Sequence, residues 1–520
     1  MLPFTTPISG HYRCPGWRVG AEDGCCPSKV FTVSATSIDE LRSGRFWDAN
    51  APERTIPGWL DLSGRWPVLH LGEPLTAPWK VVSRTESDDG TVATSFGFAD
   101  DGPERMASTV HGQLRGPGPA AVTLIGAWSA GHRQVFGLPH HDPGSQTLQA
   151  QYALLGGHEP AGSRVIAARL RLRHLDVWAP MPGMSLTTAE DGSQVGLSWQ
   201  RPSEWSSTLQ VPDGILSVDP VVNMQWPTTA GGTLQVASWL EVHDLAGLSV
   251  GEVFDQLAGP LSTLATLTAD APCPPVALEL QTELSGDSWL TLEHPALEAT
   301  DAQPLEPHRM LLSLPMVGLD VAARWLVLSR ELRPLPRVIA AATPGDRLVE
   351  SQLLELCVVA ESLHRRGLPQ DPRMSAVEAD QIRRTVAGAL AELPVPGAVM
   401  VKDLLGHLEE PGYRQRLREL AARAEPAVPG VVGLRTKWLG EIYDARNGFA
   451  HTYGSSGGTA QAYLTLLISL RWVLTGVLLM EAGIPADLLA GRLANHQPYQ
   501  TFLDQARDWL PHVYPTVASG

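Results

Sequence analysis

The hydrophobic period changes along this 520-residue chain, and this change constrains its fold more than any other feature. From about residue 35 to residue 240, short apolar alternations are broken by Gly, Pro, Asp and Asn, as in Thr91–Phe98 and Ala121–Trp128. A period of two is typical of strands with one buried face. From Ser249 onward, most apolar residues recur at helical spacing. The pattern predicts an α+β multidomain protein, with a β-sandwich-like N-terminal region followed by an all-α helical bundle.

The segments between these regions have the composition of tails and linkers. Residues 1–34 mix Pro, Gly and Cys without any period, so we expect them to be disordered or loosely attached. Thr343, Pro344 and Asp346 have the residue types of a helix start, so we expect the helical domain to begin there. The predicted division is a β-rich domain at 35–332, a linker at 333–345 and a helical domain at 346–510.

Composition narrows the class of protein. An apolar fraction of 43% and a charged fraction of 18% are those of a soluble globular protein. No basic segment followed by an apolar one directs secretion, so we expect a cytoplasmic protein. His11, Cys14, Cys25 and Cys26 could in principle hold a metal, but adjacent cysteines without a C-x-x-C pair argue against it. We therefore expect no metal and no cofactor.

One segment, Tyr463–Gly483, is apolar enough to suggest a membrane span. Arg471 lies in its middle, with hydroxyl residues on either side. We expect the central helix of the bundle here, and no membrane insertion.

The net charge of −16 is unevenly distributed. Residues 330–520 contain 20 Lys and Arg and 20 Asp and Glu, so all of the net negative charge lies upstream. Affinity for phosphate depends on Lys and Arg. An acidic N-terminal half is therefore a poor nonspecific nucleic-acid binder, and any RNA is expected to bind the helical half.

The chemistry that the helical half suggests is RNA cleavage without a metal, by Arg446 and His451. A histidine can move a proton to or from a ribose hydroxyl, and a guanidinium can neutralise the phosphate. With 35 Arg and 16 His in 520 residues, about one pair at this spacing is expected by chance. Three further pairs occur, of which we expect the first two to be structural and the third to be a weak candidate: Arg65/His70, Arg169/His174 and Arg507/His512.

Local context favours Arg446. It flanks an apolar stripe at helical spacing formed by Leu434, Trp438, Ile442, Ala445 and Phe449. On an unbroken helix His451 would lie about 140° around the axis from Arg446. We expect Gly448 to weaken the helix and let the histidine fold back. The competing interpretation is an exposed arginine with a histidine that interacts with the last helix carbonyls. Glu361 is either an orienting partner or a solvated acid.

The run RNGFAH at 446–451 resembles the R-N-x-x-x-H signature of HEPN ribonuclease domains, and specifically of the ApeA-like family of bacterial anti-phage proteins. The stretches 355–366 and 478–485 resemble an early and a late helix of that domain. Residues 44–71 and 110–124 resemble the β-rich N-terminal domain that accompanies it.

This resemblance implies an abortive-infection ribonuclease that cleaves RNA, including transfer RNA, under the control of a β-rich sensor domain. His451 would act as general acid or base, Arg446 would bind the phosphate, and Asn447 would support phosphate binding or stabilise the helix end. The implied partners are RNA, a second copy of the chain and an unknown phage trigger, with no DNA and no membrane.

Two alternatives stay open. One is a non-catalytic dimerising protein whose tryptophan-rich β-domain recognises a ligand. The other is a HEPN module that binds nucleotide or a nucleotidyltransferase partner.

Overall fold

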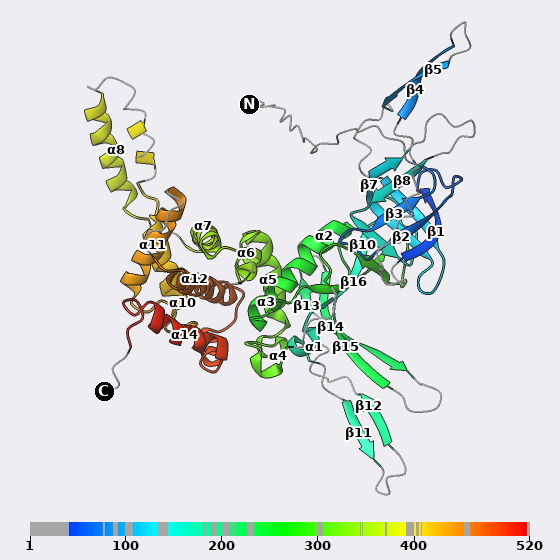
Figure 1. The fold of residues 1–520 in the computed structure, drawn as a ribbon. Helices are drawn as coiled ribbons and strands as arrows, with labels where there is room; N and C mark the ends of the chain where they lie inside the picture. The colour runs from blue at the N-terminus through cyan, green and yellow to red at the C-terminus, as the bar shows by residue number, and fades with distance from the viewer. Residues whose placement is uncertain are drawn as a thin grey trace, which may run out of the picture.

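The computed structural model describes residues 41–75, 79–86, 92–98, 108–133, 144–180, 184–188, 195–199, 209–211, 214–225, 233–298, 305–343, 345, 347–369, 372–391, 400–401, 405–406, 408–451 and 458–516. The β-rich part lies at one end of the molecule and the helical part at the other (Figure 1). The strands are β1 Leu41–Asp48, β2 Ile56–Asp61, β3 Val68–Leu71, β4 Trp79–Glu86, β5 Val92–Phe98, β6 Ser108–Leu114, β7 Ala121–Arg133, β8 Ser145–Gln149, β9 Tyr152–Leu155, β10 Val165–Leu172, β11 Met184–Thr188, β12 Val195–Trp199, β13 Leu209–Val211, β14 Gly214–Gln225, β15 Thr233–His243, β16 Pro275–Thr282 and β17 Leu290–Glu293. The helices are α1 Leu175–Trp178, α2 Val250–Val253, the π-helical turn η2 Phe254–Ala258, α3 Gly259–Ala269, the 3₁₀ turn η3 Pro307–Arg309, α4 Leu314–Val317, α5 Leu319–Leu332, α6 Leu335–Ala341, α7 Val349–Gly367, α8 Ala376–Leu390, α10 Tyr413–Ala424, α11 Arg435–His451, α12 Ala460–Glu481, α13 Ala486–Leu493 and α14 Gln497–Trp509.

Six strands close into a barrel, so the expected β-sandwich is wrong in its architecture. The order is β7-β6-β1-β2-β3-β8, and β8 pairs again with β7. Closure depends on the length of β7, whose first half pairs with β6 and β9 and whose second half pairs with β8. Gly126, with a φ of 63°, lies where the strand changes partners. Only glycine adopts this conformation without strain.

The barrel has its own apolar core around Phe46, which is fully buried. Gly112 on β6 lies directly against this ring. A Cβ atom at Gly112 would be 2.4 Å from Cδ1 of Phe46 and 2.9 Å from Cγ1 of Val122. The close approach of three strands around one phenylalanine therefore requires glycine here.

From β9 the sheet continues outward through β17, β16, β10, β15, β14 and β13. Trp178 is fully buried beside this sheet, and its Nε1 donates a 2.8 Å hydrogen bond to Thr268 of α3. In contrast, Trp59 is 50% exposed and stacks on His70. Burial in the core therefore explains some of the tryptophans of this region and not others.

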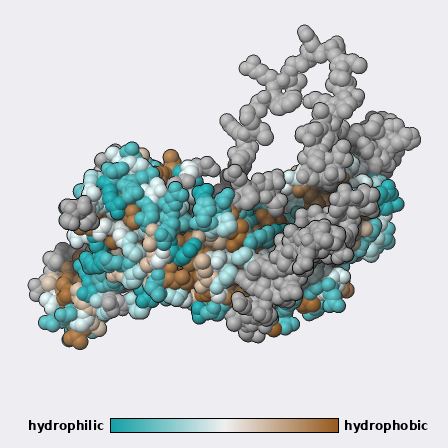
Figure 2. All heavy atoms as spheres, turned by 90° about the horizontal axis from the view of Figure 1, so that it is seen from below, coloured by the Kyte–Doolittle hydropathy of each residue, from teal (hydrophilic) through white to brown (hydrophobic). Residues whose placement is uncertain are grey.

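The helical part packs around α12, which is the most deeply buried long helix of the described residues. Length and composition would let α12 cross a membrane, but 83% of its most apolar window is buried inside the fold. The bundle helices α7, α10 and α14 pack against it. On the face seen in Figure 2, hydrophobic residues occur in small groups between hydrophilic ones.

The expected linker at 333–345 contains a helix, α6, and this part of the sequence prediction is corrected. Leu335 and Ile339 of α6 are buried, and α6 packs against α3, α7 and α12. The prolines of this segment do not break the helix, because proline is tolerated at the first positions of a helix. Helix α7 begins at Val349, after the expected start, and Pro344 and Asp346 lie outside the described residues.

A single apolar cluster extends from the outer sheet through α3, α5 and α6 to the bundle helices. Residues 1–40 lie outside the described residues, so the expectation for 1–34 stays a prediction.

Candidate functional site

Helix α11 carries the predicted motif and is held by one buried stripe. Trp438, Ile442, Ala445 and Phe449 are all buried, whereas Leu434 is 48% exposed and precedes the helix. Trp438 Nε1 donates a 2.8 Å hydrogen bond to Ser469 of α12, and Phe449 contacts the ring of Tyr463 edge-on. The predicted stripe is confirmed at four of its five positions, and Arg446 lies beside it.

The expected break at Gly448 is wrong, because α11 continues through this residue to His451. A glycine inside a helix costs only about 1 kcal/mol relative to alanine. Burial of the neighbouring Phe449 offsets this cost. His451 therefore lies about 140° around the axis from Arg446 and about 40° from Asn447. The side chain of His451 lies outside the described residues.

Arg446 is positioned by side chains from three helices. Its guanidinium carbon lies 4.5 Å from the ring centroid of Tyr413 on α10. One Nη lies 3.5 Å from a carboxylate oxygen of Glu361 on α7, and the other lies 3.5 Å from Oδ1 of Asn447. Both polar contacts are long for hydrogen bonds, so the stack on Tyr413 is the closest-fitting contact. The Arg446 side chain retains 30% exposure.

The groups below Arg446 are neutral. Burial raises the pKa of the Cys357 thiol to about 11, and burial raises the pKa of Tyr413 far above its usual value. The Tyr413 hydroxyl is buried beside this thiol, which is its hydrogen-bonding neighbour. A thiol is at most a weak partner for it. Neither group supplies negative charge to Arg446 at neutral pH.

The glutamates near Arg446 also contact other arginines. Glu361 is shared, because its other oxygen lies 3.5 Å from Arg365. Arg365 also approaches Glu410, which in turn lies 3.8 Å from Arg416.

The other Arg–His pairs have structural partners. His70 stacks on Trp59, and Arg169 is paired with Glu279 and Glu241. His174 adopts a left-handed conformation with a φ of 64° and accepts a hydrogen bond from the backbone of Leu305. The ion-pair partners of the last pair are Asp504 for Arg507 and Glu441 for His512.

Two residues at the site carried no signal in the sequence that would have identified them. Tyr413 and Cys357 lie on separate predicted helices, and only the packing of α7 against α10 and α11 brings them under Arg446. Glu361, for which the sequence allows an orienting role or a solvated one, lies beside Arg446.

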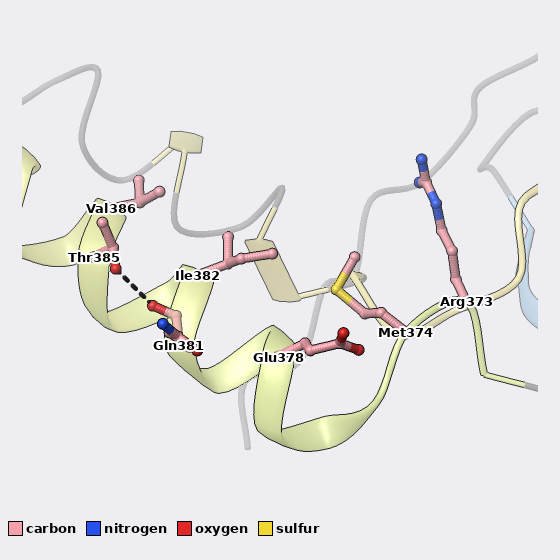
Figure 3. Close-up of a pocket in the computed structure, with 7 residues that line it drawn as sticks. All are labelled: Arg373, Met374, Glu378, Gln381, Ile382, Thr385 and Val386. Atoms are coloured by element: carbon pink, nitrogen blue, oxygen red, sulfur yellow. Dashed lines mark hydrogen bonds between the residues drawn. The ribbon is translucent and has the colours of Figure 1, made fainter.

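No group of three His, Cys, Asp or Glu with metal-binding geometry occurs within the described ranges. The considered ligands His11, Cys14, Cys25 and Cys26 lie outside them. A hollow of about 560 Å³ lies along one face of α8, and it contains neither Arg446 nor Asn447. Figure 3 shows its lining, where the only interaction drawn is a hydrogen bond from the Thr385 hydroxyl to the Gln381 carbonyl at 2.9 Å. Its lining residues are Arg373, Met374, Glu378, Gln381, Ile382, Thr385 and Val386.

The fold defines an α+β protein whose helical bundle carries Arg446 over the ring of Tyr413, with the arginine side chain 30% exposed. Comparison with protein families matches residues 354–488 to the family described as Apea-like HEPN, and this part of the chain is an Apea-like HEPN domain. It is preceded by a β-rich region. HEPN domains are typically metal-independent ribonucleases, usually bind RNA and often dimerise. No curated protein and no solved structure matches the chain significantly.

Proposed function

We propose that the chain is an anti-phage ribonuclease that acts in the cytoplasm and cleaves RNA without a metal, under control of its β-rich half. Transfer RNA is the first substrate to test. The observation that carries the proposal is Arg446, a half-buried guanidinium held on Tyr413 within an Apea-like HEPN domain. The residues that follow it complete the R-N-x-x-x-H signature.

The chemistry follows from the two side chains of the motif. A ribose 2′-hydroxyl attacks the adjacent phosphorus, the bond to the 5′-oxygen breaks, and a 2′,3′-cyclic phosphate and a 5′-hydroxyl result. His451 removes the proton from the nucleophile or supplies one to the leaving oxygen. Arg446 neutralises the charge that builds on the phosphate. Asn447, beside Arg446 and on the His451 side of the helix, supports the orientation of the phosphate.

The unbroken helix α11 supports a site composed by two copies of the chain. Arg446 and His451 of one copy lie about 140° apart around the axis, and one histidine supplies one acid–base group. In-line cleavage benefits from a base on one side of phosphorus and an acid on the other. A two-fold axis beside the end of α11 would bring His451 of the partner subunit into the same cleft.

The same separation of Arg446 from His451 favours a second candidate function, a non-catalytic protein in which the HEPN bundle serves only for dimerisation. Inducible expression of the wild type, His451→Ala and Arg446→Ala, with sequencing of RNA cleavage ends, separates the two. The proposed ribonuclease produces new ends only in the wild type. Identical ends in all three strains would support the non-catalytic protein and exclude the proposed site.

A further inference from the structure

Two arginines and two tyrosines form a reciprocal arrangement across α10 and α11. The guanidinium of Arg446 on α11 lies over the ring of Tyr413 on α10, and the guanidinium of Arg414 on α10 lies over the ring of Tyr443 on α11. The guanidinium carbon of Arg414 lies 4.0 Å from the centroid of the Tyr443 ring. The two tyrosine rings lie 6.4 Å apart and are inclined by 39°. These four side chains, here called the Arg–Tyr strip, extend the surface from the Arg446 site toward the start of α10.

Backbone geometry explains why the strip is continuous. Tyr443 and Arg446 are three positions apart on α11, so they lie on the same face of the helix. Tyr413 and Arg414 are the first two residues of α10. Packing of α10 on α11 brings these two pairs together.

The outer end of the strip is an uncompensated cation. Arg414 is exposed, and no carboxylate lies within 4 Å of its guanidinium among the residues that the structure describes. Its chain neighbour Tyr413 is neutral, because burial raises the pKa of the hydroxyl. Most other arginines of the bundle are in ion pairs, including Arg365, Arg383, Arg423 and Arg435. The guanidinium of Arg414 instead lies over the ring of Tyr443 and is open to solvent.

A planar cation on an aromatic ring is a platform for an unpaired nucleobase. Bases stack on guanidinium planes and tyrosine rings, while the guanidinium edge can contact a phosphate. The bases of an A-form duplex are already stacked and paired, so they cannot use such a platform.

We infer that the Arg–Tyr strip is a subsite for single-stranded RNA, with an unpaired base next to the scissile phosphate stacked at Arg414 and Tyr443. This inference rests on the proposed ribonuclease function and adds its substrate class. The phosphate lies at Arg446, and the neighbouring nucleotide extends along α10. The enzyme therefore selects loops and other unpaired segments, and it rejects duplex RNA.

The test measures binding of full-length His451→Ala protein, in which turnover of the RNA is expected to be slowed by about 10²–10⁴. The probe is a fluorescein-labelled single-stranded RNA of about twelve nucleotides, compared with its duplex, by fluorescence anisotropy at several salt concentrations. Tyr443→Leu removes the platform and is expected to weaken single-strand binding about tenfold to a hundredfold. Tyr443→Phe retains the ring and is expected to bind like the parent. Arg414→Gln is expected to weaken binding and to lower the salt slope by about 0.7.

The matched control is Arg337→Ala. Arg337 is an exposed arginine on α6, away from α10 and α11, and its loss changes the net charge as Arg414→Gln does. Arg337→Ala is expected to leave affinity and salt slope at the parent values. Thermal melting of each variant checks its folding. If Tyr443→Leu is destabilised, the comparison is made with Arg414→Gln, whose side chain is exposed.

The outcomes separate this inference from the proposed function. Parent affinity in both Tyr443→Leu and Arg414→Gln overturns the subsite, and so does duplex RNA that binds as tightly as the single strand. If Arg446→Ala in an otherwise wild-type chain still abolishes cleavage, the proposed function survives that result. Absence of any RNA cleavage or RNA binding by the wild type overturns both proposals. The subsite is supported if Tyr443→Leu binds the single strand more weakly than the parent, while Tyr443→Phe and the Arg337→Ala control bind it with the parent affinity.

Discussion

Arg471 donates a 3.1 Å hydrogen bond to the carboxylate of Asp270, although the two residues are 201 positions apart in the chain. Asp270 ends α3 with a φ of 51°, and Arg471 lies in the middle of α12. His496 contacts the second carboxylate oxygen at 2.9 Å. This ion cluster explains how the most apolar helix of the bundle accommodates an arginine, and it ties the outer sheet region to the bundle.

Acid should weaken this connection, and Asp270→Asn should abolish that response. Burial alone would raise the pKa of Asp270, but the hydrogen bond from His496 and the charge of Arg471 outweigh it and lower the pKa below its usual value. A carboxylate whose pKa is lowered in the folded state stabilises the protein at pH values above its unfolded pKa, which is near 4. This stabilisation is lost as the pH falls through the folded pKa. At pH 7, Asp270→Asn should reduce the free energy of unfolding by about 3–5 kcal/mol, because Arg471 loses its charge partner.

Urea unfolding of the wild type and Asp270→Asn between pH 7 and pH 3 measures this effect. The difference between the two proteins should shrink toward the acid end. A difference that stays constant over this range would contradict the pKa argument.

Gly112→Ala should destabilise the barrel. The new methyl group would overlap Phe46 and Val122, and overpacking of this kind costs about 1–3 kcal/mol. Gly131→Ala on β7 is the control, since the nearest atom to its new Cβ is 3.9 Å away. Thermal melting should show a lower midpoint for Gly112→Ala alone, and equal midpoints would argue against the close approach.

Cleavage should depend on the motif and not on a metal. His451→Ala should lower the rate by about 10²–10⁴ through the loss of proton transfer. Arg446→Lys should also be impaired, since an ammonium group lacks the planar fork and does not stack on Tyr413 in the same way. RNA should be cut and DNA should not, with 2′,3′-cyclic phosphate ends and no inhibition by chelators. Full activity of His451→Ala, or 5′-phosphate ends that require magnesium, would contradict the mechanism.

The active species should be a homodimer, for which the unbroken α11 gives the geometric reason. Light scattering at the concentrations used for RNA cleavage tests this. Mixing His451→Ala with Arg446→Ala subunits should restore part of the activity if one copy supplies each residue. Monomers that cleave RNA would remove the composite site.

Residues 340–520 alone should not form a stable nuclease. The cut would remove α5 and most of α6, whose buried side chains belong to the same apolar cluster as the bundle. Exposing such a surface costs about 25 cal/mol for each Å². The fragment should be less soluble and less toxic than the whole chain. A folded and more toxic fragment would instead show that the N-terminal half inhibits the bundle.

The residues that could be interpreted from sequence are those with local patterns. The stripe from Trp438 to Phe449 has helical spacing, and α11 follows it. Closure of the barrel could not be predicted, because the alternation in β7 is the same whether its second half pairs with β8 or ends a sandwich. Gly448 does not end α11, because its cost is local and small, whereas the burial that offsets this cost arises from tertiary packing that the sequence pattern does not show. Tyr413 under Arg446 arises from helix packing, which no spacing in the chain encodes.

The shared core of the two parts also has a consequence for how such chains diverge. A bundle whose inner surface is completed by α3, α5 and α6 cannot be transplanted by joining sequences at a linker. Recombination that supplied this bundle with a different N-terminal region would have to keep α3 to α6, together with Asp270, and exchange only the barrel and its outer strands. The inheritable unit is therefore the bundle with its supporting helices, and its boundary lies upstream of the limits of the Apea-like HEPN match at 354–488.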